Sequence, residues 1–246
     1  MATVPEDLPL GQATAIAGTL LERLRRERPA VHVLTSPVAM PLSANVLLAA
    51  GAEPSMTSRP EVVEEFVTAS RALVVNLGML DADRETAIER AVPTALASGR
   101  PWVLDPVKVD QAGRRRRFAL DLLHRRPAVL RANHAEIACL AGAGQEPGAL
   151  ARAFDTVVLA TGTVDQVTDG SRTFRVGLGS PFMQRVTAMG CALSALTGGF
   201  LAVAGDAFEA AVGAILTFDV AGEIAAAEAR GPGSFKIAFL DALYGL

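Results

Sequence analysis

Short, almost continuously apolar runs alternate with longer stretches of helical periodicity over the first two thirds of the chain. The apolar runs are rich in β-branched residues and end in polar residues or glycine, which is typical of buried parallel strands. They predict strands over residues 30–35, 72–78, 101–107, 128–133 and 156–162. The helical periodicity predicts helices over residues 10–28, 39–50, 61–70, 83–98, 115–124 and 134–141. This alternation predicts an α/β fold with a mostly parallel central sheet and helices on both faces.

The last third of the pattern differs. Residues 166–177 alternate around Asp169-Gly170, which predicts a hairpin with its turn at that dipeptide. Residues 188–245 read as helical, with a break at residues 230–235. No linker, repeat or low-complexity tract divides the 246 residues, so we expect a single domain over residues 1–246.

Composition narrows the function classes. Half of the residues are hydrophobic, a fifth are charged and the net charge is -3, which gives no general attraction to nucleic acid or to an anionic membrane. The two cysteines, Cys139 and Cys191, are too few for a disulfide framework or a cysteine-ligated zinc site. No signal peptide and no membrane-spanning run is evident, so we expect a cytoplasmic protein. The four arginines at 114–117 are expected to form a solvated helix face rather than a phosphate contact.

Ligands of open α/β sheets bind beyond the carboxyl ends of the strands. The residues at the predicted strand ends are Thr35, Asn76, Asp105, Arg131, Asn133 and Thr161. None of the predicted strands is followed by G-x-G-x-x-G, and no G-K-[ST] sequence occurs, which argues against a dinucleotide fingerprint and a Walker P-loop.

Two carboxylates fall at this edge of the predicted sheet. Asp105 ends a strand, and Glu136 lies on the first turn of the helix that follows Asn133. Such a pair could hold Mg²⁺ partly through water, as Mg²⁺ is held near nucleotide phosphates. The alternatives are a turn or cap role for Asp105 and a capping-box role for Glu136.

The sequence Ala188-Met189-Gly190-Cys191 opens an apolar helical run. A helix N-terminus presents unpaired N–H groups, and small residues let a phosphate approach them closely. These features predict an anion hole here, in which a Cys191 thiolate would be stabilised and could accept a proton from an attacking hydroxyl. A neutral Cys191 thiol would be a poor base and would mainly position that hydroxyl. The alternative is that Cys191 is a small buried hydrophobe.

Several longer motifs are more specific. They are "SANVLLAAGAEPSM" (43–56), "LDPV" (104–107), "RANHAEIACLAG" (131–142), "TGTVDQVTDG" (161–170), "VTAMGCALSA" (186–195) and "GPGSFKIAFLDAL" (231–243). With these motifs, nearly the whole chain resembles the hydroxyethylthiazole kinase family of the ribokinase-like superfamily.

The resemblance implies a ribokinase-like fold and ATP- and Mg²⁺-dependent phosphorylation of 4-methyl-5-(2-hydroxyethyl)thiazole in thiamine salvage. It also implies a homotrimer with active sites between subunits. The site residues that it implies are Cys191, Gly190 and Met189 for catalysis; Arg131, Thr161 and Asn133 for the nucleotide; Met56, Ala188 and Gly78 for the alcohol; and Asp105 and Glu136 for the metal.

The chain also departs from the family pattern. The usual G-T-G-C is A-M-G-C, so Ala188 and Met189 replace glycine and threonine, and the methyl group of Ala188 would crowd an anion if its φ were positive. Ala132 replaces the glycine of R-G-N, Met79 replaces the threonine of N-x-G-T, and the segment between Gly142 and Thr156 is shorter, with a surface helix expected to be trimmed.

These departures keep alternatives open. They are a related kinase for another small alcohol, a non-catalytic homologue that binds a thiazole or a nucleotide, and a redox-active thiol protein, the last disfavoured because no resolving cysteine pattern exists. The surviving Asp105, Glu136, Arg131, Thr161 and Cys191 favour retained kinase activity.

Overall fold

A computed structural model describes residues 6–142 and 146–246. The strands are β1 (Glu6–Asp7), β2 (Ala30–Leu34), β3 (Glu53–Ser55), β4 (Ala72–Asn76), β5 (Trp102–Asp105), β6 (Val129–Asn133), β7 (Val157–Thr161), β8 (Asp165–Thr168) and β9 (Arg172–Val176). The α-helices are α1 (Leu10–Glu27), α2 (Met40–Ala50), α3 (Val63–Ala69), α4 (Ala82–Ala97), α5 (Gly113–Leu123), α6 (His134–Ala141), α7 (Pro147–Phe154), α8 (Met189–Leu201), α9 (Ala207–Glu228) and α10 (Pro232–Gly245). A short 3₁₀ helix, η1, spans Pro181–Arg185.

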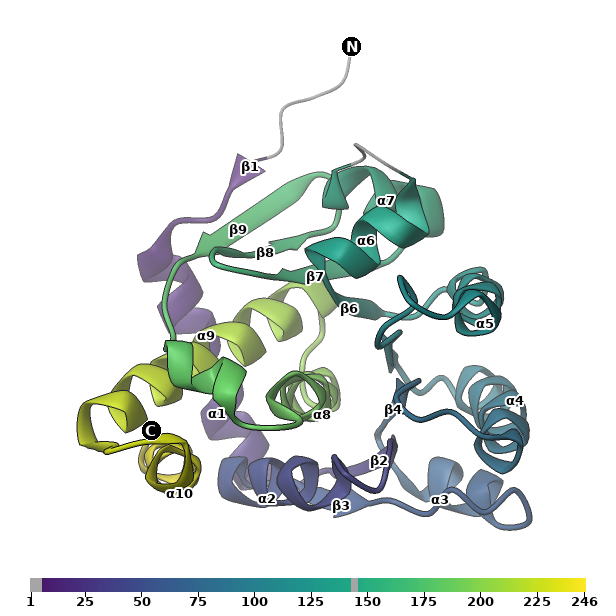
Figure 1. The fold of residues 1–246 in the computed structure, drawn as a ribbon, viewed down its shortest axis with the longest axis horizontal. Helices are drawn as coiled ribbons and strands as arrows, with labels where there is room; N and C mark the ends of the chain where they lie inside the picture. Colours follow the sequence, from purple (N-terminus) through teal and green to yellow (C-terminus); the bar gives the residue numbers. More distant parts are fainter. Residues whose placement is uncertain (1–5, 143–145) are drawn as a thin grey trace.

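One twisted sheet runs through the molecule in the order β1-β9-β8-β7-β6-β5-β4-β2-β3 (Figure 1). The pairings from β3 through β7 are all parallel, and β7–β8 and β8–β9 are antiparallel. The five strands predicted from apolar runs are β2, β4, β5, β6 and β7, so the mostly parallel α/β sheet is confirmed.

Helices cover both faces of the sheet and bury two separate apolar cores. Successive strand residues alternate between the cores: Val74 of β4 belongs to the core shared with α1, α2, α8, α9 and α10, whereas its neighbours Leu73 and Val75 belong to the core shared with α3 to α7. Figure 1 shows α3, α4 and α5 on one side of the sheet and α1, α8 and α9 on the other. Nearly every side chain of the central strands is therefore buried, which explains their continuous apolar runs.

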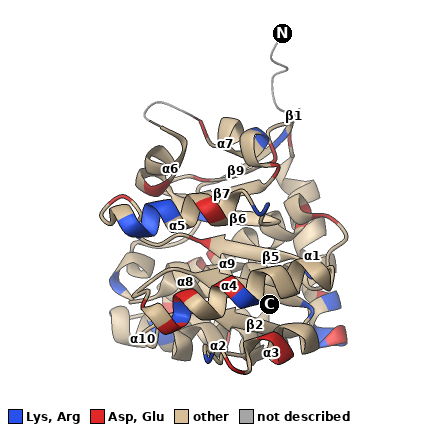
Figure 2. Ribbon diagram, turned by 90° about the vertical axis from the view of Figure 1, so that its right-hand side faces the viewer, with Lys and Arg blue, Asp and Glu red and all other residues tan. Residues whose placement is uncertain are grey.

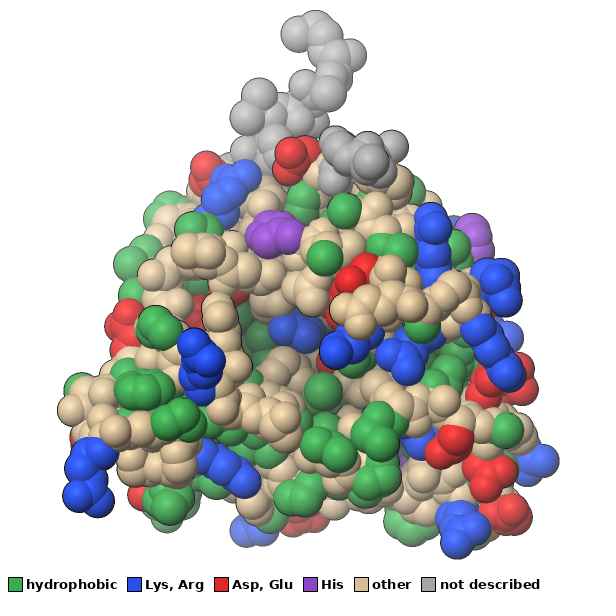
Figure 3. Space-filling view, viewed as in Figure 1, with side chains coloured by type: hydrophobic (Ala, Val, Ile, Leu, Met, Phe, Trp, Pro, Cys, Tyr) green, Lys and Arg blue, Asp and Glu red, His purple; other side chains and the backbone are tan. Residues whose placement is uncertain are grey.

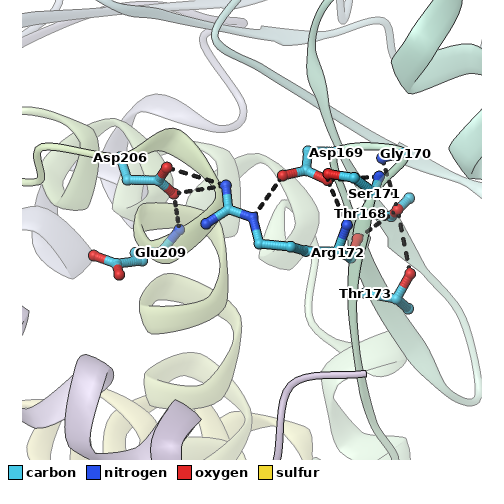
Figure 4. Close-up of polar contacts among 8 residues, drawn as sticks. All are labelled: Thr168, Asp169, Gly170, Ser171, Arg172, Thr173, Asp206 and Glu209. Atoms are coloured by element: carbon cyan, nitrogen blue, oxygen red, sulfur yellow. Dashed lines mark hydrogen bonds and ion pairs between the residues drawn. The ribbon is translucent and has the colours of Figure 1, made fainter. Parts of the chain in front are cut away.

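The hairpin of β8 and β9 turns at Asp169-Gly170 as predicted, with Gly170 at φ 91°. Asp169 accepts hydrogen bonds from the backbone N–H groups of Ser171 (2.8 Å) and Arg172 (2.7 Å), and these contacts lower the pKa of its carboxyl to about 2 despite partial burial. Arg172 also forms an ion pair with Asp206 at 3.0 Å, and Asp206 caps the start of α9 (Figure 4). This ion pair thus connects the hairpin to the start of α9, a helix that packs on the sheet.

The end of the chain holds one more break than the sequence predicts. The helical stretch 188–245 is divided into α8, α9 and α10. The additional break precedes Asp206, whose side chain accepts from the N–H of Glu209 (2.9 Å) and starts a new helix; the apolar rhythm hides this cap. The second break falls just before Pro232, within the predicted region.

The shortened segment after Gly142 keeps a helix. The eight-residue α7 begins with Pro147 at its first position and packs Leu150 and Ala151 into the core. Whether a helix is trimmed here relative to the family stays a prediction, and residues 143–145 of the segment lie outside the described residues. The three-residue β3, the two-residue β1 and η1 are too short to give a periodic signal and were not predicted.

Helix α9 is long and apolar enough to cross a membrane by length and composition, but 72% of that stretch is buried inside the fold. Figure 1 shows it running across one face of the sheet beside α8 and α1. Its burial accounts for its apolar composition and identifies it as a core helix of this fold.

The four arginines at 114–117 begin α5, which Figure 2 shows as a basic helix at the surface. Arg114 forms an ion pair with Glu85 at 2.7 Å, and Arg115 donates to the carbonyl of Val107 at 2.7 Å. Three of the four side chains are exposed, as expected of a solvated face.

Candidate active site

Register brings the polar strand ends together in pairs. Asn76 of β4 is the direct neighbour of Asp105 of β5, and Asn133 of β6 is the direct neighbour of Thr161 of β7. The strands that carry them are adjacent and parallel, so all four residues share the carboxyl edge of the sheet. The prediction that this edge gathers the polar residues is confirmed.

Asp105 is completely buried at this edge. Its Oδ2 accepts hydrogen bonds from the Asn76 amide and the Ser194 hydroxyl, each at 2.7 Å. Its Oδ1 has no hydrogen-bond partner in the described part of the chain and lies 3.8 Å from Nη1 of Arg131. Burial raises the pKa of the Asp105 carboxyl, and the Arg131 guanidinium opposes that rise. One carboxylate oxygen is thus held in place while the other faces a cation.

Arg131 connects Asp105 to the next strand and to α8. Its Nη2 donates to Thr161 Oγ1 at 2.8 Å, and its side chain is only 14% exposed. A Cβ placed on Gly190 would stand 2.6 Å from Nη1 and 2.8 Å from Nη2 of Arg131. Only glycine allows the guanidinium to lie this close to the start of α8.

Both carboxylate oxygens of Glu136 accept hydrogen bonds from backbone N–H groups. Its Oε2 accepts from the N–H of Asn133 at 2.9 Å while Asn133 Oδ1 accepts from the N–H of Glu136, which forms the capping box of α6. Its Oε1 accepts from the N–H of Lys108 at 2.6 Å. The capping-box interpretation of Glu136 is therefore confirmed. Within residues 6–142 and 146–246, no group of three or more His, Cys, Asp or Glu side chains could hold a metal by itself.

The first turn of α8 has the geometry of an anion site. Ala188 is its N-cap, at φ 67° in the left-handed region, so the condition under which its methyl group is expected to crowd an anion is met. The first intrahelical bond runs from the N–H of Ala192 to the carbonyl of Ala188, so the N–H groups of Met189, Gly190 and Cys191 precede it and have no partner within the helix.

The expectation of a stabilised Cys191 thiolate is wrong. Burial and the nearby Asp105 carboxylate raise the pKa of the Cys191 thiol to about 12, and the smaller opposing effects of Arg131 and Asn76 do not compensate. Near neutral pH the side chain is a neutral thiol, because desolvation beside a carboxylate outweighs the helix N-terminus.

A cavity of about 610 Å³ opens beside this turn, between the ends of β6 and β7, the segment 177–184 and helices α8 and α9. The predicted site residues in its lining are Arg131, Asn133, Thr161, Met189 and Gly190. The other predicted site residues, Cys191, Asp105, Glu136, Met56, Gly78 and Ala188, lie outside its lining. The residues expected to contact a nucleotide thus share one cavity. The residues expected to contact the alcohol lie outside the lining of that cavity.

Two further carboxyl groups in the cavity lining escaped the sequence analysis. Asp165 of β8 and Asp219 of α9 are 8% and 2% exposed. Burial and the neighbouring Asp165 raise the pKa of Asp219 to about 9, and burial also raises the pKa of Asp165, so the pair carries at least one proton near neutral pH. A charged residue in the middle of the apolar α9 was the available signal.

Met56 and Gly78 lie on two loops that do not line this cavity. His32 of β2 holds the first loop: its Nε2 contacts the Thr57 carbonyl at 3.0 Å, and its Nδ1 contacts Ser55 Oγ at 2.7 Å. Since a carbonyl only accepts, Nε2 carries the proton and Nδ1 accepts from Ser55. Burial lowers the pKa of His32 to about 4, so this clamp on both neighbours of Met56 is neutral.

The fold defines a structural class. The structure superposes on a ribokinase-like superfamily protein from Enterococcus faecalis with a TM-score of 0.70 at 12% identity, over 97% of this chain and 95% of that one. At this identity the likeness concerns the fold alone, which is the ribokinase-like α/β fold.

Closer comparisons give the family. The profile of the hydroxyethylthiazole kinase family matches residues 21–246. The chain is 45% identical to the hydroxyethylthiazole kinase of Cereibacter sphaeroides over 93% of both chains, and 44% identical to that of Rhizobium etli over 92% of this chain and 95% of that one. It matches the structure of a hydroxyethylthiazole kinase protein from Pyrococcus horikoshii with a TM-score of 0.91 at 40% identity, over 95% of this chain and 94% of that chain. The chain belongs to the hydroxyethylthiazole kinase family.

Proposed function

We propose that this protein transfers the γ-phosphoryl group of ATP to the hydroxyl of 4-methyl-5-(2-hydroxyethyl)thiazole. The observation that carries the proposal is the meeting of Arg131, the glycine at position 190 and the free N–H groups of α8 beside a cavity of about 610 Å³. A guanidinium and a helix N-terminus both favour a phosphate. Family membership supports the thiazole alcohol as the acceptor.

The cavity is the proposed ATP site. Arg131 neutralises the phosphate chain, Thr161 holds that guanidinium through its hydroxyl, and Asn133 closes the same wall. The N–H groups of Met189, Gly190 and Cys191 receive the negative charge that develops on the phosphoryl group during transfer. Asn133 contributes through its cap of α6, because its side-chain oxygen is already used by Glu136.

Asp105 and Glu136 fit a water-assisted magnesium site. Asp105 Oδ1 is a buried carboxylate oxygen without a hydrogen-bond partner in the described chain, and Glu136 is a buried carboxylate whose oxygens retain further acceptor capacity. Two carboxylates leave the remaining positions to water and phosphate, which Mg²⁺ prefers. Bound Mg²⁺ would neutralise phosphate charge during transfer.

Cys191 positions the acceptor hydroxyl. Its thiol has a pKa of about 12 and is a poor base near neutral pH. Its place behind Gly190 on the first turn of α8 puts it beside the proposed anion hole. A late proton loss from the attacking hydroxyl, with the thiol orienting the nucleophile, fits this environment.

A cytoplasmic homotrimer is part of the proposal. Val38, in the loop after β2, is 54% exposed, and Met79, next to Gly78, is 61% exposed. Figure 3 shows hydrophobic side chains gathered on the lower part of the face that it displays, over the region where Figure 1 shows α2. A second subunit that covers exposed apolar side chains would complete the acceptor side of the site, because the acceptor-side residues do not line the cavity of a single chain.

The test is ADP release by the purified protein with MgATP, with and without the thiazole alcohol. Thiazole-dependent ADP release supports the proposal. ADP release with another alcohol of a panel, and not with the thiazole, would redirect it to another acceptor. A folded protein that binds ATP without turning over any alcohol would contradict it and favour a non-catalytic binding homologue.

A further inference from the structure

Arg84 is a buried cation on the acceptor side of the site. It lies in the first turn of α4 and is 3% exposed. No carboxylate forms an ion pair with it within the described residues, where the only acidic contact near it is Asp81, whose Oδ1 accepts from the backbone N–H of Arg84 at 2.8 Å. Burying a guanidinium without a paired carboxylate is unfavourable, so its partners indicate what it is for.

Its partners are backbone carbonyls of one turn. Nη2 donates to the carbonyl of Asn76 at 2.5 Å, and Nη1 donates to the carbonyl of Gly78. The planar guanidinium fork therefore spans the turn that follows β4 and fixes two of its peptide groups at once. Nε has no partner among the described residues, so these two carbonyls carry the interaction.

The same turn connects to the centre of the site. Asn76 Oδ1 accepts from the N–H of Gly78 at 3.0 Å, and Asn76 Nδ2 donates to Asp105 Oδ2 at 2.7 Å. The next residue, Met79, has φ 49°, a left-handed conformation that a non-glycine residue adopts only when its surroundings impose it. The clamp by Arg84 is such a constraint.

We propose that Arg84 is a positioning residue for the acceptor alcohol: it holds the turn 76–79 in the shape that keeps Gly78 bonded to Asn76 and Asn76 bonded to Asp105. The inference rests on the proposed function for the identity of the acceptor, and its effect on the turn is independent of that function. Arg84 is not a cavity-lining residue, so its loss leaves the nucleotide side in place.

The variants are Arg84→Met, which removes the fork, and Arg84→Lys, which keeps the charge and can reach one carbonyl. The control is Arg90→Met, because Arg90 lies on the same helix and also donates to a backbone carbonyl, that of Pro60 at 3.1 Å, but is exposed. Arg84→Met is expected to raise KM for the thiazole alcohol by about tenfold or more and to change KM for ATP by less than about twofold. Arg84→Lys should fall between Arg84→Met and wild type, and Arg90→Met should match wild type.

Amide hydrogen exchange supplies a readout that does not need activity. Exchange should accelerate in peptides covering residues 76–80 of the Arg84 variants and stay at the wild-type rate in peptides covering residues 129–133. If Arg84→Met does not fold, Arg84→Lys is read by both measurements.

Unchanged exchange over 76–80, or a KM increase shared equally by both substrates, would overturn the inference. Faster exchange with an unchanged KM for the alcohol would also overturn it, because the turn would then not position the acceptor. If the wild-type protein turns over no thiazole, the proposed function fails, and exchange together with calorimetric binding of the thiazole still decides the role of Arg84.

Discussion

The guanidinium of Arg131 lies against the α-carbon of Gly190, so close that a Cβ at position 190 would stand 2.6 Å from Nη1 and 3.0 Å from Cζ. The contact joins the end of β6 to the first turn of α8, two segments some sixty residues apart in the sequence. It brings a fixed cation to the N-terminal turn of a helix, an arrangement that favours the binding of a phosphate chain.

Gly190→Ala should therefore weaken ATP binding by displacing the guanidinium from Thr161 and Asp105. We expect KM for ATP to rise by about tenfold while the thermal midpoint changes little, because the displaced group is the far end of a long side chain. Steady-state kinetics at varied ATP checks this. Gly18→Ala is the matched control, since a Cβ on Gly18 meets nothing within 4 Å. An unchanged KM for ATP would remove Arg131 from the nucleotide site.

Cys191→Ser should retain much of the activity. Because the thiol has a pKa of about 12, it acts as a neutral group, and a hydroxyl of similar size can replace it; kcat is expected to fall by less than about tenfold. Cys139→Ser, on a helix away from the first turn of α8, is the control. A loss of about a hundredfold or more confined to Cys191→Ser would instead identify the thiolate as the base.

Ala188→Gly should stabilise the protein. Ala188 has φ 67°, and a left-handed conformation costs an alanine about 1 kcal/mol that glycine does not pay. We expect the free energy of unfolding to rise by up to about 1 kcal/mol, a shift of the thermal midpoint of about 2–4 °C. Calorimetry checks this against Ala188→Val, whose β-branched side chain should shift the midpoint the other way. If Ala188→Gly melts below wild type, the backbone at 188 is not strained.

The buried His32 should make stability depend on pH on the acid side. Its folded-state pKa is about 4, below the ordinary value of 6.5, so the unfolded chain binds the proton first as the pH falls. The contribution is fully present above about pH 6.5 and is lost between about pH 6.5 and 4, up to about 3 kcal/mol. Denaturant unfolding across this range measures the free energy of unfolding at each pH. Its dependence on pH should be shallower for His32→Gln than for the wild type. His124→Gln, at an exposed position, should keep the wild-type slope.

Much of the fold follows from local pattern. Apolar runs predict the five central parallel strands because those strands are buried on both faces, and Asp169-Gly170 marks its hairpin because the turn needs a glycine at positive φ. The short β3 and the break before Asp206 did not follow, because a three-residue strand has no period and a lone cap does not interrupt an apolar rhythm.

The sequence predicts the candidate site less completely than it predicts the fold. Arg131, Thr161 and Asp105 could be placed at one sheet edge, since parallel strands end together. The protonation state of Cys191 could not be predicted, because it depends on the burial of the thiol and on a carboxylate 86 positions earlier in the chain. Arg84 and His32 were missed for a similar reason: their partners are backbone carbonyls and a hydroxyl, which leave no mark in a sequence.

Asp105 Oδ2 receives one hydrogen bond from the turn after β4 and one from α8. A shift of either segment changes the environment of the same oxygen, so occupation of the acceptor side and occupation of the nucleotide side act on a common group. In the proposed function the two ligands would therefore be thermodynamically linked: whatever factor the alcohol imposes on the affinity for the nucleotide, the nucleotide imposes on the affinity for the alcohol.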